Sequence, residues 1–184
     1  MAASTKRAEE SISDCLGAQQ DRQSITSDWN SLQDAIEGVR IREMKNVLKS
    51  GGDVLCEVFR RDWMLDDGEV DQVFQSVMNP GSISAWHVHH RTTDRLFASH
   101  GVLQIVLFDA RQNSPTYGRI NEFRFGALRP ALLIIPPGVF HGVRNISHEP
   151  ALLLNLVNRA YQYEDPDQWR LPPDTDKIPY RFER

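Results

Sequence analysis

The sequence predicts an all-β fold, either a sandwich or a small barrel. From Gly38 onward, short runs rich in apolar residues alternate with turn signals such as SGGD, NPGS, RQNSPTYG and IPPG. Short strands separated by Gly, Pro, Asn and Asp clusters produce this pattern. We expect strands at 39–45, 53–61, 72–78, 82–90, 95–101, 102–110, 118–125, 131–137 and 151–158.

The two ends of the chain differ from this central pattern. Residues 1–35 are rich in Ser, Gln, Asp and Glu and contain few β-branched apolar residues. Such a segment buries too little apolar surface to offset the entropy lost on ordering. We therefore expect a polar, flexible N-terminal arm over 1–35 and one domain over 36–184. From Tyr161 the chain is dense in Pro and Asp, which predicts an extended segment that wraps the barrel, with one helical turn near 167–169.

The composition fits one globular domain, with 184 residues, 40% hydrophobic, 25% charged and a net charge of −4. No run dense in Lys or Arg is present, which argues against nucleic acid as a partner. The longest apolar run, ALLIIPPGVF, is shorter than the ~18 residues of a membrane span. The N-terminus lacks the apolar core of a secretory signal, and Cys15 and Cys56 make no disulfide framework. We expect a cytoplasmic protein without a membrane partner.

A histidine cluster stands out in the stretch AWHVHHRTTD. Alternate side chains of a strand share a face, so His87 and His89 point one way and His90 the other. The Cα atoms of His87 and His89 lie ~6.6 Å apart in a strand, a separation across which two imidazoles can converge. Asp94 follows after a short turn, and His141 comes after a Pro-Gly turn much later. The sequence therefore predicts a pocket shared by His87, His89 and His141.

These two stretches resemble the two sequence motifs of the cupin superfamily. The first reads Gly81, five residues, His-x-His, four residues, Asp94, six residues, Gly101, and the second reads IPPGVFHGVRN. Asp94 stands where the first motif usually has Glu, and Pro130 replaces the leading Gly of the second. The resemblance implies a double-stranded β-helix, the jelly-roll cupin fold. In a metal-binding cupin the matching ligands would be His87, His89, Asp94 and His141. That set suits Fe, Mn, Zn, Ni or Cu rather than Ca or Mg.

A closer resemblance covers residues 36–182. DARQNSPTYGRI, LLIIPPGVFHGV, IEGVRIREMK and KIPYRF resemble segments of the dTDP-4-dehydrorhamnose 3,5-epimerase family. That implies a homodimeric cupin, with no required metal, that epimerises carbons beside the ketone of a nucleotide-linked sugar. It also implies that His87 is the base, that Arg95 replaces the family's enolate-stabilising lysine, and that His141 contacts the substrate. A histidine near its ordinary pKa suits proton abstraction, and a nearby cation suits the developing enolate.

Several active-site positions depart from the family's pattern. His89 stands where the family has a glutamine, and Ser84 stands where it has an arginine. Leu154 stands at the position of the proton-returning tyrosine. The carboxylate that orients the base matches Asp174 only with a shift of one residue. Tyr161 and Tyr163 lie a few residues beyond Leu154 and are alternative proton donors. The departures favour an epimerase or isomerase with an altered substrate or regiochemistry.

Three hypotheses therefore remain. The leading one is an epimerase or isomerase of a keto sugar or sugar nucleotide, without a required cofactor, that uses His87 and Arg95. In it His89, His141 and Trp86 contact the substrate, although core packing is the alternative for Trp86. The second is a metal-dependent cupin enzyme, favoured by histidine instead of glutamine at position 89. The third is a non-catalytic cupin that binds a sugar.

Overall fold

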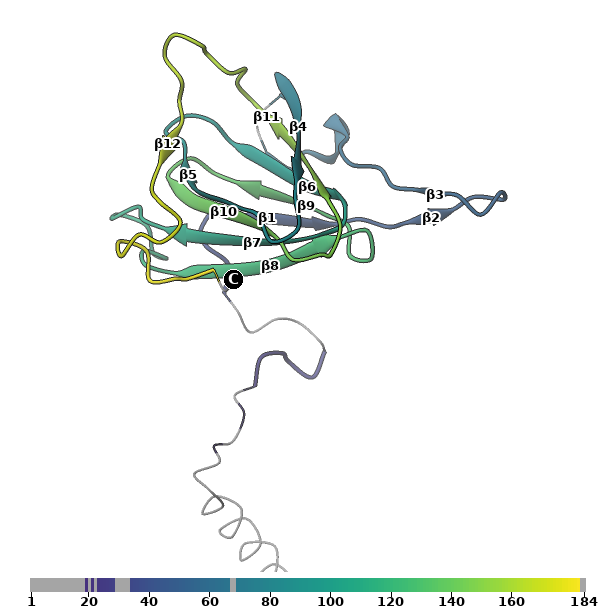
Figure 1. Ribbon diagram of the computed structural model, residues 1–184, viewed down its shortest axis with the longest axis horizontal. Coiled ribbons are helices and arrows are strands. Elements are labelled where there is room, and N and C mark those ends of the chain that lie inside the picture. Colours follow the sequence, from purple (N-terminus) through teal and green to yellow (C-terminus); the bar gives the residue numbers. More distant parts are fainter. Residues whose placement is uncertain (1–18, 20, 22, 29–33, 67–68, 183–184) are drawn as a thin grey trace, which may run out of the picture. The chain divides into compact units, whose positions relative to one another are not determined.

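The computed structural model describes residues 19, 21, 23–28, 34–66 and 69–182 (Figure 1). The chain divides into two units, Met1–Asp34 and Ala35–Arg184. The expected N-terminal arm lies mostly outside the described residues. The fold described below belongs to the second unit. Among the described residues, no helix is long and apolar enough to cross a membrane.

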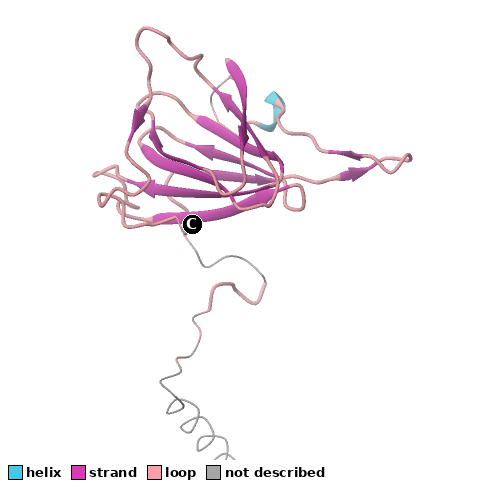
Figure 2. Cartoon of the chain, viewed as in Figure 1, coloured by secondary structure: helices cyan, strands magenta, loops and turns pink. Residues whose placement is uncertain are grey.

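The second unit is built from two five-stranded antiparallel sheets (Figure 2), which confirms the predicted all-β jelly-roll class. The first sheet has the order β1 (Arg40–Glu43), β9 (Ala131–Ile135), β6 (Asp94–His100), β11 (Ala151–Val157) and β4 (Gln72–Met78). The second has the order β12 (Trp169–Arg170), β5 (Ile83–Val88), β10 (Val139–Asn145), β7 (Val102–Asp109) and β8 (Ile120–Gly126). A separate hairpin pairs β2 (Val47–Leu48) with β3 (Val54–Leu55), and a short 3-10 helix spans Arg61–Trp63.

The main core lies between the two sheets. Leu103, Ile105 and Leu107 alternate along β7, and each is fully buried in this core together with Leu133 and Ile135 of β9. The intervening Val106 faces the other side of the second sheet, as strand alternation requires. There the C-terminal segment covers it with Ile178, Phe182 and neighbouring side chains. The end of the chain thus seals the outer face of the second sheet.

Two sequence-based expectations about elements are wrong. The helical turn expected near 167–169 is a strand instead, because Trp169 and Arg170 pair with β5. The expected strand 53–61 is regular only at Val54–Leu55. Its later residues turn onto the outer face of the first sheet, where Cys56, Val58 and Phe59 pack against a buried apolar cluster. Strand β10 follows the Pro-Gly turn that was expected before His141, although its residues were not among the expected strand ranges.

The SPTYG motif forms a structural turn between β7 and β8. The Asp109 carboxylate accepts hydrogen bonds from Arg111 Nε (2.8 Å), Ser114 Oγ (2.6 Å) and Thr116 Oγ1 (2.6 Å). Although burial opposes ionisation, these bonds hold the pKa of Asp109 well below its usual range. Arg111 also donates to the Glu37 carbonyl (2.7 Å), which fastens the start of the domain to this turn.

The Pro-Gly turn before β10 helps to position the site. Gly138 has φ of 81°, a conformation that residues with a Cβ rarely adopt. Its N–H donates to the carbonyl oxygen of His89 (2.8 Å), so the turn before β10 is joined to the chain just after β5. The two histidine-bearing motifs are therefore connected through the backbone.

Candidate functional site

A cavity of about 500 Å³ is lined by side chains of both sheets and of the C-terminal segment. All four residues of the expected ligand set line it, namely His87, His89, Asp94 and His141. His87 on β5 stands in register with His141 on β10, and His89 follows just past the end of β5. Asp94 opens β6 on the opposite sheet. The tertiary structure thus collects these groups from three strands and one loop.

His87 is held at both ring nitrogens. Ser84 Oγ lies 2.9 Å from His87 Nε2, and Gln168 Nε2 lies 3.2 Å from His87 Nδ1. Burial, together with the positive charge of His141, Arg170 and His89, lowers the pKa of His87 to about 4. The pKa of His87 therefore lies below the ordinary value that the sequence analysis assumed, and the imidazole is neutral at neutral pH, which is the form that can accept a proton.

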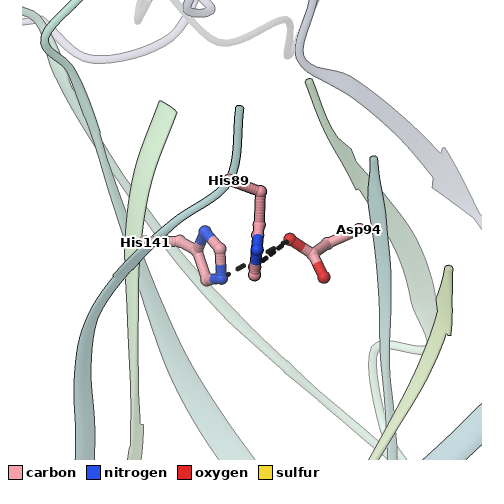
Figure 3. Close-up of side chains that lie close together, drawn as sticks. All are labelled: His89, Asp94 and His141. Atoms are coloured by element: carbon pink, nitrogen blue, oxygen red, sulfur yellow. Dashed lines mark ion pairs between the residues drawn. The ribbon is translucent and has the colours of Figure 1, made fainter. Parts of the chain in front are cut away.

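His89, Asp94 and His141 form a tight group deeper in the cavity (Figure 3). Asp94 Oδ2 lies 3.1 Å from His89 Nε2 and 3.6 Å from His141 Nε2. Burial alone would lower the pKa of His89, but the hydrogen bond and charge of Asp94 raise it. The pKa of Asp94 is lowered despite its burial, chiefly by its hydrogen bond with His89. Burial lowers the pKa of His141.

The C-terminal segment fixes the loop that carries His89. The Asp167 carbonyl oxygen accepts a hydrogen bond from His89 Nδ1 (2.5 Å). The Asp167 carboxylate accepts from the backbone N–H groups of residues 90, 91 and 92 at 2.9, 2.8 and 2.9 Å, and from the Thr92 hydroxyl at 2.9 Å. Burial opposes ionisation of this carboxyl, yet these bonds lower the pKa of Asp167 to about 2. Asp167 escaped the sequence analysis because its partners lie more than 70 residues earlier.

The expected catalytic role of Arg95 is not supported by its position. Arg95 is fully buried, and its guanidinium forms a double hydrogen bond with Asp66 at 2.8 and 2.9 Å. Among the described residues, the cavity wall includes Asp94 but not Arg95. Strand alternation explains the correction, because adjacent residues of β6 face opposite sides of the sheet.

Arg170 is the cation that the structure brings to His87. It lies in register with His87 on the neighbouring strand β12 and lines the cavity. Its charge contributes to the lowered pKa of His87. No sequence pattern indicated Arg170, since a two-residue strand has no recognisable periodicity.

The expected contact of Trp86 with substrate is also corrected. Trp86 is fully buried on the outer side of β5, with ring centroids 5.3 Å from Phe182 and 6.1 Å from Tyr180. Because Trp86 precedes His87 directly, alternation already sends it away from the cavity. The core-packing alternative is the one that the structure supports.

The two candidate proton donors, Tyr161 and Tyr163, differ in their position relative to the cavity. Tyr161 lines the cavity, whereas Tyr163 is 87% exposed and contacts Tyr161 edge-on at 5.3 Å between ring centroids. Leu154 packs against the apolar cluster on the outer face of the first sheet. Within the described part of the chain, Asp174 does not line the cavity, and Gln168 makes the contact with His87 instead.

Comparisons with known proteins identify relatives of this chain. Residues 33–179 match the family dTDP-4-dehydrorhamnose 3,5-epimerase. The "Probable low-salt glycan biosynthesis epimerase Agl13" of Haloferax volcanii is 36% identical over 142 residues, which are 76% of this chain and 89% of that protein. The "Spore coat polysaccharide biosynthesis protein SpsL" of Bacillus subtilis is 31% identical over 147 residues, which are 80% of this chain and 96% of that protein.

Solved structures agree with these sequence relatives. The dTDP sugar isomerase from Desulfovibrio desulfuricans G20 superposes with a TM-score of 0.73 at 27% identity, over 79% of this chain and 90% of that chain. ChmJ, a 3'-monoepimerase from Streptomyces bikiniensis in complex with dTDP-quinovose, gives 0.70 at 21% identity, over 79% and 75%. At that identity the likeness to ChmJ shows a shared fold. By its sequence match over most of its length and by its fold, this chain belongs to the dTDP-4-dehydrorhamnose 3,5-epimerase family.

Proposed function

We propose that this protein epimerises a nucleotide-linked keto sugar by removing a proton from a carbon next to the carbonyl, with His87 as the base. The observation that carries the proposal is the position of His87. It lines the cavity, is oriented by Ser84 and Gln168, and faces a cation in Arg170. Membership of the family and the relative named as an epimerase support the same reaction class.

Arg170 takes the part that was expected of Arg95. Removing a proton beside a carbonyl leaves negative charge on the carbonyl oxygen, and a fixed cation lowers the energy of that state. Arg170 lines the same cavity and stands opposite His87 in the sheet.

Tyr161 is the proposed acid that returns a proton from the other side. It lines the cavity and belongs to the segment that leads to Gln168 and Arg170. Arg91 and Arg159 also line the cavity, and we assign them to the phosphates of the nucleotide. Arginine is well suited to this because its planar donors match phosphate oxygens in pairs.

The homodimer and the cytoplasmic location stay predictions. The surface that we propose for the dimer is on β4, an edge strand that exposes Val73, Phe74 and Val77. Apolar edge strands are commonly covered by a partner. Light scattering of the purified chain, which gives its mass in solution, checks the dimer.

Solvent isotope exchange tests the proposed reaction. The protein is incubated in D₂O with dTDP-4-keto-6-deoxyglucose, and deuterium at the carbons beside the carbonyl is followed by NMR. We expect incorporation by the native protein and a loss of about 100-fold or more in His87→Asn, the scale of general base catalysis. His90→Asn is the matched control, because His90 packs on Trp169.

Exchange that persists in a folded His87→Asn variant would overturn the assignment of the base. Binding of the nucleotide sugar without any exchange by the native protein would instead favour a sugar-binding cupin.

A further inference from the structure

We propose that a second cavity, on the outer face of the second sheet, binds the phosphate group of a small phosphate monoester. This cavity has a volume of about 510 Å³, which is within the range of small-molecule sites. Its walls come from β7, β8, β10 and the C-terminal segment, and they include Gln104, Glu122, Arg124, Arg144, Tyr180 and Arg181. None of these six residues lines the first cavity, which contains His87.

Strand alternation places the side chains of the second cavity on one face of the sheet. On β7, Leu103 and Ile105 point into the main core, so Gln104 between them points outward. Gln104 stands in register with Arg124 of β8 on one side and with Arg144 of β10 on the other. Figure 1 shows these three strands side by side. The amide of Gln104 therefore lies in a row between two cations.

Positive charge predominates among the residues that line the second cavity. Arg124, Arg144 and Arg181 line it together with one carboxylate, that of Glu122. Three positive charges against one negative charge leave an excess of two. This excess predicts an anionic ligand. Arginine side chains suit phosphate in particular, because their planar donors match phosphate oxygens in pairs.

Two buried polar atoms of this cavity have no hydrogen-bond partner among the described residues. They are Gln104 Oε1, in a residue that is 6% exposed, and Arg144 Nε. Unpaired buried polar atoms are rare in folded proteins, because each has given up its hydrogen bonds with water. The oxygen accepts hydrogen bonds and the nitrogen donates them. Together they indicate a ligand that accepts from Arg144 and donates to Gln104.

Hydrogen bonds fix which end of the Gln104 amide is unpaired. Gln104 Nε2 donates to Glu122 Oε1 (2.8 Å) and to the Tyr180 hydroxyl (2.9 Å), which itself donates to Glu122 Oε2 (2.7 Å). Burial opposes ionisation of Glu122, yet the bonds from Tyr180 and Gln104 lower its pKa. Turning the amide over would set its oxygen against this carboxylate, with two acceptors facing each other. Gln104 Oε1 therefore requires an O–H or N–H from the ligand.

A phosphate monoester combines the two properties that the unpaired atoms require. Its oxygens accept hydrogen bonds from arginine, and its second pKa of about 6 leaves an O–H on part of the molecules near neutral pH. A sulfate ester offers acceptors alone. The pyrophosphate of a nucleotide sugar has no terminal phosphate and lacks this O–H. The second cavity is therefore distinct in its ligand from the first, where we place the nucleotide sugar.

Calorimetry with a matched pair of ligands tests the site. The full chain is titrated at pH 6 with glucose 6-phosphate and, separately, with glucose 6-sulfate and with inorganic phosphate. We expect one equivalent of glucose 6-phosphate to bind. Glucose 6-sulfate should bind at least about 10-fold more weakly, because it leaves Gln104 Oε1 without a donor. Inorganic phosphate should also bind more weakly, because it fills less of the cavity.

Variants assign the binding to one of the two cavities. Arg144→Gln should weaken the binding of glucose 6-phosphate by about 10–100-fold, the scale of losing a hydrogen bond with a charged group, and should leave deuterium exchange at the native rate. Arg91→Gln, in the first cavity, is the matched control and should bind glucose 6-phosphate as the native protein does. Circular dichroism verifies folding, and Arg124→Gln serves if Arg144→Gln does not fold, since Arg124 is exposed.

A water molecule that bridges Gln104 and Arg144 is the rival explanation of the two unpaired atoms. It predicts no saturable binding of glucose 6-phosphate, and that result overturns the site. Binding that is weakened by Arg91→Gln and not by Arg144→Gln would place the phosphate in the first cavity and would also overturn the site. Equal affinity for glucose 6-sulfate would refute the donor requirement of Gln104, and equal affinity for inorganic phosphate would refute the assignment to an ester.

Discussion

The side-chain amide nitrogen of Asn155 donates a 2.6 Å hydrogen bond to Oδ1 of Asp94. The amide oxygen of Asn155 accepts a 3.1 Å hydrogen bond from the backbone N–H of Arg95. The two bonds fix the orientation of the amide, because its nitrogen only donates and its oxygen only accepts. They join β11 to the start of β6 at a buried point. The direction of the Asp94 carboxylate is therefore set by a residue 61 positions away.

Replacing Asn155 should destabilise the protein. Asn155→Ala leaves the Asp94 carboxylate and the Arg95 N–H with one buried partner fewer each, and a lost partner of this kind costs roughly 1–3 kcal/mol. Urea unfolding measures the change. Asn46→Ala is the control, because Asn46 is exposed and makes one hydrogen bond with the Ala127 carbonyl. Equal losses in the two variants would contradict the assigned importance of the buried amide.

Arg95 should act on stability and not on catalysis. Asp66→Asn keeps the size of its side chain but removes the charge that pairs with the buried guanidinium. We expect a loss of roughly 1.5–3 kcal/mol in the free energy of unfolding, the range for hydrogen bonds to charged groups. Deuterium exchange per folded protein should stay at the native rate. A fall in the exchange rate at unchanged stability would instead indicate that Arg95 has a catalytic role.

The lowered pKa of Asp167 predicts that the free energy of unfolding depends on pH. Its pKa falls from the ordinary 3.8 to about 2 on folding, so the folded state favours the charged carboxylate. The stabilisation is fully present above the unfolded pKa, and it is lost as the pH falls through the folded value. Asp167→Asn should therefore be less stable than the native chain at pH 7 and pH 5, and the gap should narrow below pH ~4. Urea unfolding at pH 7, 5, 4 and 3 measures it, and a constant gap would refute the assignment.

Arg170 should support the charged intermediate. We expect Arg170→Gln to lower the exchange rate by about 100-fold, the scale of removing one charge-stabilising donor from an active site, and Arg170→Lys to retain part of it. Arg124→Gln is the control, because Arg124 is an exposed arginine on β8. If kcat stays native while KM alone rises, Arg170 binds substrate only.

Tyr161 should separate exchange from inversion. Tyr161→Phe leaves His87 able to remove and return a proton on one face, so deuterium still enters the substrate. The inverted product should fall by about 100-fold or more, because general acid catalysis from the other face is lost. Tyr163→Phe should behave as the native protein, since Tyr163 is exposed. Native inversion by Tyr161→Phe would require another acid. The two products are distinguished by NMR of the sugar protons.

Local pattern was enough to predict the fold class and the histidine pair. Turn residues punctuate apolar runs, and a strand places His87 and His89 on one face, as the cavity wall shows. The same alternation also predicts that Trp86 and Arg95 face away from the cavity. Each directly adjoins a residue of the cavity, so each faces the opposite side of its sheet.

The sequence by itself determined most of the strands, the motif turns and the family resemblance, because these depend on neighbours within a few residues. Only the tertiary structure decided the partners of the site. Arg170 and Gln168 reach His87 because the C-terminal segment adds a two-residue strand to β5. Asn155 reaches Asp94 because β11 lies beside β6. Such contacts join segments about 60 to 80 residues apart, and their register follows from packing of the whole sheet, which no local pattern records.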